Sequence, residues 1–166
     1  RRPDRSAAIG RSEGSDGFPG PDGEQTLSAV AGPAAPLAQA MAHALRLLER
    51  SPALALEQAE EILRQAGPHP PARLVQAIAR ERCGQGPAAI KEMESLVSGH
   101  PGWATAQIEL GLMLGRAGHG ERAIVALRRG LALAPEHPQA WRILGDHLSA
   151  TGDDAGADHA YSMHTR

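Results

Sequence analysis

Apolar residues recur at helical spacing along most of the chain, and short breaks separate the helical stretches. Between residues 104 and 135, two amphipathic patterns flank a turn at Gly118-His119-Gly120, and Pro135 ends the second pattern. Apolar side chains spaced three and four residues apart share one side of a helix. The pattern therefore predicts two antiparallel helices joined by a tight turn.

The same helix pair recurs at a spacing of about 34 residues. We call a set of equivalent positions in successive repeats a column of the repeat. Small residues in some columns would let the two helices cross closely, and glycine in another would allow a positive φ in the turn. We expect Leu127 and Tyr161, together with Leu110 and Leu144, to fill the space between pairs. The columns that define the repeat are Gly84, Ala89, Leu110, Gly111, Gly118, Ala123, Pro135, Trp141, Leu144, Gly145, Gly152, Ala157 and Tyr161.

Three full units are predicted, over residues 70–103, 104–137 and 138–166, behind a degenerate first pair at 37–68. Ser51-Pro52 would start the second helix of that first pair, because serine is a good N-cap and proline a good first helical residue. The His-Pro pairs at His69, His100 and His137 are unevenly spaced, so we interpret them as turn chemistry at different phases of the repeat. Trp103 and Trp141 are also out of phase.

Residues 1–36 are rich in glycine and proline and poor in apolar side chains. Such a segment buries too little apolar area to offset its ordering entropy, so a disordered tail is predicted. The chain lacks an initiator methionine, and its last helix ends at Arg166 without a polar capping helix. We therefore expect a fragment whose repeat array continues in missing sequence.

The composition of the chain argues against several classes of partner and cellular location. The net charge is -2, the pI is near 6.5 and aromatics are 2% of residues, which argues against nucleic acid as a partner. No apolar run approaches the roughly 20 residues that cross a bilayer, so no membrane insertion is expected. Cys83 is the single cysteine, which excludes an intramolecular disulfide and favours a cytoplasmic protein. The abundance of alanine and arginine suggests a bacterial genome.

The sequence shows no spacing of residues that is typical of a catalytic or metal-binding site. The eight histidines include no pair spaced four apart, and His159 and His164 would point about 140° apart on a helix. Glu60-Glu61 and Asp153-Asp154 are adjacent rather than facing. We therefore predict no catalytic residue, no metal site and no cofactor.

The repeat columns resemble the tetratricopeptide repeat family, over residues 70–166 and more weakly over 37–68. The string WRILGDHLSATGDDAGADHAY is a strong instance. The chain departs from the family at Gln107, where tryptophan is usual, and at Gly130, where alanine is usual. We expect both departures to weaken packing locally. The resemblance implies an all-α, right-handed solenoid of antiparallel helix pairs.

A narrower resemblance is to the N-terminal repeat arm of bacterial tetratricopeptide-repeat sulfotransferases. It is carried by the string HPQAWRILGDHLSATGDDAGADHAYSMHTR and by RRGLALAP before it. In that family a catalytic domain follows and binds 3'-phosphoadenylylsulfate through a loop after a strand. No such strand–loop–helix pattern occurs here, so no catalytic residue is carried over.

In the tetratricopeptide family, the first helices of the pairs line a concave, ligand-binding face. The matching positions here predict a groove with apolar anchors and recurring arginines, suited to a protein or peptide segment of acidic character. The function expected is an interaction scaffold, with the arm of a larger sulfotransferase as the alternative and an autonomous helical enzyme as a third hypothesis. The predicted groove residues are Leu74, Ile78, Arg82, Ile108, Leu112, Arg116, Arg142 and Asp146, with Ser149 beside them.

Overall fold

The computed structural model describes residues 34–165, which form eight α-helices and no strand. Most of the tail expected over 1–36 lies outside the described residues, and its last three residues open the first of these helices. None of the described helices combines the length and the apolar character needed to span a bilayer. The helices are α2 (Ala34–Arg50), α3 (Pro52–Ala66), α4 (Pro70–Arg82), α5 (Gly86–Gly99), α6 (Ala104–Arg116), α7 (Gly120–Leu133), α8 (Pro138–Ala150) and α9 (Asp154–His164).

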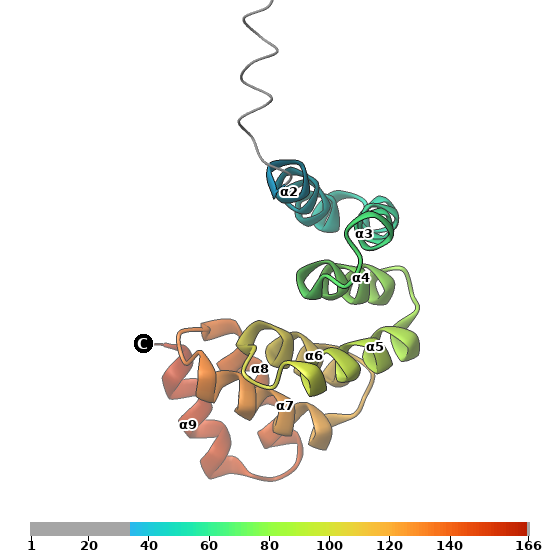
Figure 1. The fold of residues 1–166 in the computed structure, drawn as a ribbon. Helices are drawn as coiled ribbons and strands as arrows, with labels where there is room; N and C mark the ends of the chain where they lie inside the picture. The colour runs from blue at the N-terminus through green and yellow to red at the C-terminus, as the bar shows by residue number, and fades with distance from the viewer. Residues whose placement is uncertain (1–33, 166) are drawn as a thin grey trace, which may run out of the picture. The chain divides into compact units, whose positions relative to one another are not determined.

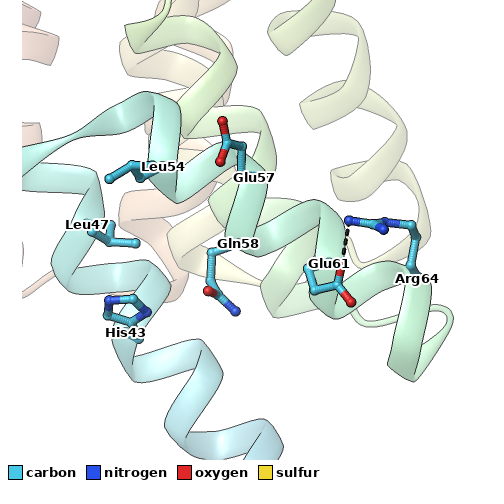
Figure 2. Close-up of a pocket in the computed structure, with 7 residues that line it drawn as sticks. All are labelled: His43, Leu47, Leu54, Glu57, Gln58, Glu61 and Arg64. Atoms are coloured by element: carbon cyan, nitrogen blue, oxygen red, sulfur yellow. Dashed lines mark ion pairs between the residues drawn. The ribbon is translucent and has the colours of Figure 1, made fainter.

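The helices follow one another as antiparallel pairs, from the blue α2 to the red α9 (Figure 1). The first pair, α2 and α3, is enlarged in Figure 2. Helices α5 and α7 each pack against their own partner and against the first helix of the next pair. Helix α3 packs against α4, and α9 packs against α8. First helices also touch, α4 with α6 and α6 with α8. The predicted all-α solenoid of helix pairs is confirmed.

One turn geometry recurs within the three full pairs. Gly84, Gly118 and Gly152 have φ of 84°, 82° and 82°, which confirms the positive φ expected for the turn glycines. After each glycine, the next amide donates to a carbonyl five residues back, at 2.9 Å in all three turns. This is the Schellman arrangement, which satisfies carbonyls left free at a helix end.

Histidines begin two of the first helices. The Nδ1 atoms of His69 and His137 each accept a hydrogen bond from the amide three residues on, at 3.2 Å, and a proline follows each histidine. The two residues lie two repeat lengths apart, so the prediction that the His-Pro pairs fall at different phases is wrong for them. His100 instead follows the end of α5. Asp153 caps α9, whereas Ser51 precedes α3 without a side-chain capping bond.

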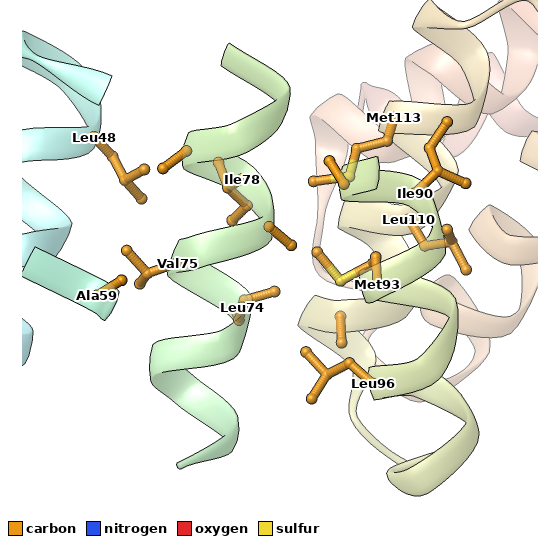
Figure 3. Close-up of a cluster of buried hydrophobic side chains, with 14 of the residues drawn as sticks. Leu48, Ala59, Leu74, Val75, Ile78, Ile90, Met93, Leu96, Leu110 and Met113 are labelled. Atoms are coloured by element: carbon orange, nitrogen blue, oxygen red, sulfur yellow. The ribbon is translucent and has the colours of Figure 1, made fainter. Parts of the chain in front are cut away.

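Within residues 34–165, buried apolar residues form two clusters. The first runs from α2 to α7 with α4 at its centre (Figure 3), and the second lies among α6, α7, α8 and α9. Leu48 of α2 and Ala59 of α3 lie on one side of α4, and Met93 and Leu110 lie on the other. Residues 74–79 of α4 are consequently all buried. Each fully buried leucine or methionine contributes roughly 1.5–3 kcal/mol.

Glycines on the first helices receive large side chains from the second helices. A Cβ added at Gly111 would lie 2.6 Å from Leu127 Cγ, and one at Gly145 would lie 2.5 Å from Tyr161 Cε1. Leu127 and Tyr161 thus pack within their own pair, which the expectation that they fill the space between pairs did not include. The reason is that the missing Cβ leaves a notch where the helices cross. Leu127 also shares a buried cluster with Leu144 and Leu148 of the next pair.

The two departures from the family pattern have structural explanations. The Nε2 of Gln107 donates to the Pro101 carbonyl at 3.4 Å, and the Nε1 of Trp141 makes the same bond to Pro135 at 2.8 Å one repeat later. A Cβ at Gly130 would lie 2.5 Å from a side-chain atom of Ile108. Glycine therefore permits the close approach of α7 to α6, and the expected weakening at this position is wrong.

Candidate partner-binding surface

Helix α6 keeps one narrow side open to solvent in the middle of the stack. Its accessible residues include Thr105, Glu109, Leu112 and Arg116, whose spacings of four, three and four place them on one side of the helix. We call these four residues the α6 face. Helices α4 and α8 pack beside α6, so a segment bound on the α6 face would lie between its neighbours.

The apolar residues of the predicted groove differ in accessibility. Leu74 and Ile78 are each 9% exposed, and Ile108 is 3% exposed because it packs on Gly130 of α7. Leu112 is half-buried and packs against the second buried cluster, which includes Leu144 and Leu148 of α8. Of the four apolar positions, Leu112 is therefore the one that offers surface on the α6 face.

The arginines of the predicted groove all have acidic neighbours within the chain. The Nη1 of Arg82 donates to the Leu48 carbonyl at 2.5 Å and to Glu49 at 3.2 Å. The Nε of Arg116 donates to Glu81 at 2.6 Å. Each of these pairs joins the end of one first helix to the end of the preceding first helix, so the arginines also tie the pairs together.

On α8, the predicted residues form a small network. The Nη1 of Arg142 lies 3.1 Å from Asp146, and Asp146 accepts a hydrogen bond from the Tyr161 hydroxyl at 3.0 Å. This bond to Asp146 raises the pKa of Tyr161 above its ordinary value. Ser149 is exposed at the end of the same side of α8, where Ile143 is half-buried.

Glu109 is a residue of this surface that the sequence reasoning missed. Burial raises the pKa of its carboxyl, and the Arg116 and Arg82 guanidinium groups offset only part of that shift. Within residues 34–165, the Glu109 carboxyl accepts no side-chain hydrogen bond. The available signal was a single charged residue between Ile108 and Leu110, in a stretch where its neighbours are apolar.

A second charged cluster links three helices through Arg80. Its guanidinium lies 3.3 Å from Glu60 of α3 and 3.0 Å from Glu92 of α5. With its amide oriented to satisfy both neighbours, Gln76 donates to Glu92 and accepts from Arg80. Burial raises the pKa of Glu92, against the opposing effect of Arg80. These groups satisfy one another, so the cluster is structural.

A groove of about 390 Å³ lies between α2 and α3 (Figure 2). Its lining includes Leu47 of α2 and Leu54 of α3, and Leu54 is 49% exposed. Glu57 and an ion pair between Glu61 and Arg64 lie along α3.

Within residues 34–165, no group of three or more His, Cys, Asp or Glu side chains lies close enough to hold a metal ion. Several histidines have packing or capping contacts instead. The His147 ring lies over Gly115, and the His159 ring meets Trp141 edge-on with centroids 6.0 Å apart. Cys83 is exposed beyond the end of α4.

No family model matches the chain, and no curated protein matches it in sequence. Solved structures of MamA are similar in fold. A crystal structure of MamA superposes with a TM-score of 0.67 at 17% identity, covering 86% of this chain and 82% of that one. A MamA RS-1 ArsTM double mutant gives a TM-score of 0.67 at 19% identity, covering 86% and 79%.

At these identities the similarity establishes the fold alone. The matches give no support to the narrower resemblance to sulfotransferase arms. The chain shares with MamA an all-α solenoid of tetratricopeptide-like helix pairs.

Proposed function

We propose that this chain is a protein-interaction scaffold that binds a segment of a partner protein across the α6 face and the neighbouring side of α8. The observation that supports this best is the composition of the α6 face. Half-buried Leu112 lies one turn from charged side chains on both sides, Glu109 and Arg116. An apolar anchor with charges around it suits a protein segment.

The acidic character of the partner follows from Arg82, Arg116 and Arg142. Each arginine already has an acidic neighbour, so a partner carboxylate would replace an internal one. Exposed ion pairs are worth only about 0–1 kcal/mol. The Arg142–Asp146 pair is exposed on both sides, 43% and 50%, so this exchange costs little there. Glu81, the partner of Arg116, is only 15% exposed, so the exchange costs more at Arg116.

A panel of short labelled peptides tests the proposal by fluorescence anisotropy. All peptides carry the same leucines at helical spacing, and they differ in whether aspartate or lysine surrounds them. We expect saturable binding of the aspartate peptides. The double variant Arg116→Glu/Arg142→Glu should weaken it by about tenfold, which corresponds to about 1.4 kcal/mol.

The matched control is Arg128→Glu/Arg129→Glu, which makes the same charge change on two exposed residues of α7. This control should bind the aspartate peptides within about twofold of the parent chain. Equal loss in both double variants would show a net-charge effect and contradict a specific site. Absence of saturable binding to every peptide would contradict the scaffold proposal on this surface.

A further inference from the structure

The carboxylate of Glu109 lies among charges that are engaged elsewhere. The groups that act on it electrostatically are Arg116 on its own helix, Arg82 and Glu81 on α4, and His137 at the start of α8. Arg82 donates to Leu48 and Glu49, and Arg116 donates to Glu81. The His137 Nδ1 accepts the capping hydrogen bond of α8.

Glu109 thus makes no ion pair with any side chain between residues 34 and 165. It is half-buried, and burial disfavours its charged form. A carboxylate withdrawn from water without a cation of its own is unfavourable. An incoming cation would therefore gain more here than at an exposed acid, because the carboxylate has already lost part of its hydration.

The surroundings of Glu109 define what kind of cation fits. Leu112 lies on the same side of α6, about one turn away, and offers apolar surface. Lysine and arginine carry an aliphatic stem that packs on apolar surface and a charged end that reaches beyond it. A compact hydrated metal ion would find a single carboxylate and no further ligand set within the described residues.

We propose that Glu109 receives a lysine or arginine side chain of the partner segment, whose stem packs on Leu112. This inference rests on the proposed function and adds to it one cationic position in an otherwise acidic and apolar partner. The bound segment then carries charges of both signs. Its carboxylates face Arg116 and Arg142, and its cation faces Glu109.

The test compares two labelled peptides of the aspartate type that differ at one central residue. One has lysine there, and the other has acetyl-lysine, which keeps the length and loses the charge. The parent chain should bind the lysine peptide about five- to tenfold more tightly. Glu109→Gln should abolish that preference while binding the acetyl-lysine peptide as before. Glu121→Gln, at an exposed residue of α7, is the control that should retain the preference.

The pH dependence supplies a second readout. The advantage of the lysine peptide should shrink as pH falls through the raised pKa of Glu109, because protonation removes the charge that the ammonium group meets. The acetyl-lysine peptide should show no such change attributable to Glu109, so Glu109→Gln should leave its pH profile unaltered. Binding of both peptides with equal affinity would overturn the cation position alone. Binding of neither would overturn the scaffold proposal, and the position with it.

Discussion

Two physical arguments make opposite predictions for the stability of Gly130→Ala, a substitution that adds one Cβ atom. Alanine is a better helix former than glycine by about 1 kcal/mol, so helix propensity alone makes the variant more stable. The structure predicts the reverse. A Cβ at residue 130 would lie 2.5 Å from Ile108 Cγ1, 3.0 Å from the Ile108 amide nitrogen and 3.3 Å from the Ala104 carbonyl oxygen.

The size of the expected loss in stability depends on which of the neighbouring atoms can move away from the added Cβ. Two of the three neighbouring atoms belong to the backbone of α6, and Ile108 is only 3% exposed. Helices α6 and α7 must therefore separate, and overpacking of this kind costs about 1–3 kcal/mol. Because backbone atoms are involved, we take the upper part of that range. After the gain in propensity, Gly130→Ala should lower the free energy of unfolding by about 1–2 kcal/mol.

Urea denaturation followed by circular dichroism measures this difference, and thermal denaturation should show Tm lowered by about 2–8 °C. Gly99→Ala is the control, because an added Cβ there has no atom within 4 Å. Its stability should equal or exceed that of the parent chain. If Gly130→Ala raises the free energy of unfolding as propensity alone requires, the close approach of α6 and α7 is refuted.

Three other contacts lead to predictions that can be measured. His137→Ala should lower the free energy of unfolding by about 1 kcal/mol, because α8 loses its capping acceptor, and His137→Asn should retain most of it; urea midpoints compare the two. Arg80→Met should cost about 2–3 kcal/mol at pH 7 by leaving the Glu92 carboxylate half-buried without its cation. Because the pKa of Glu92 is already raised, the difference from the parent chain should shrink at acidic pH as Glu92 is protonated; an equal loss at both pH values would contradict this. Asp146→Asn should lower the pKa of Tyr161 toward its ordinary value, and ultraviolet titration reports it cleanly because Tyr161 is the single tyrosine. An unshifted titration would contradict the hydrogen bond between them.

The turns and the repeat length follow from local rules that can be applied to the sequence. Gly118 and Gly152 occupy equivalent positions, and positive φ is a property that glycine adopts without strain. Apolar periodicity likewise identifies which stretches are helical. The equivalence of His69 and His137 was also present in the sequence, at twice the repeat length, but the His-Pro pair at His100 obscured it.

Which side of α6 faces solvent was decided by tertiary packing. Successive residues on a helix point 100° apart, so the apolar pattern alone left Ile108 and Glu109 as neighbouring candidates for the surface. The approach of α7 through Gly130 buries Ile108 and leaves Glu109 half-buried. The ion pair of Arg116 with Glu81 likewise depends on the spacing between α4 and α6.

The sequence by itself determined the helix pairs, their turns and the architecture that repeats them, because these depend on interactions within a few residues or on a fixed period. Only the tertiary structure decided the surface that a partner meets. That surface is what remains after neighbouring pairs have covered the rest, and the distance between pairs depends on single atoms such as the missing Cβ of Gly130. The charge of each groove residue was readable from the sequence, but whether the charge is already paired was not, because its neighbour comes from another helix pair.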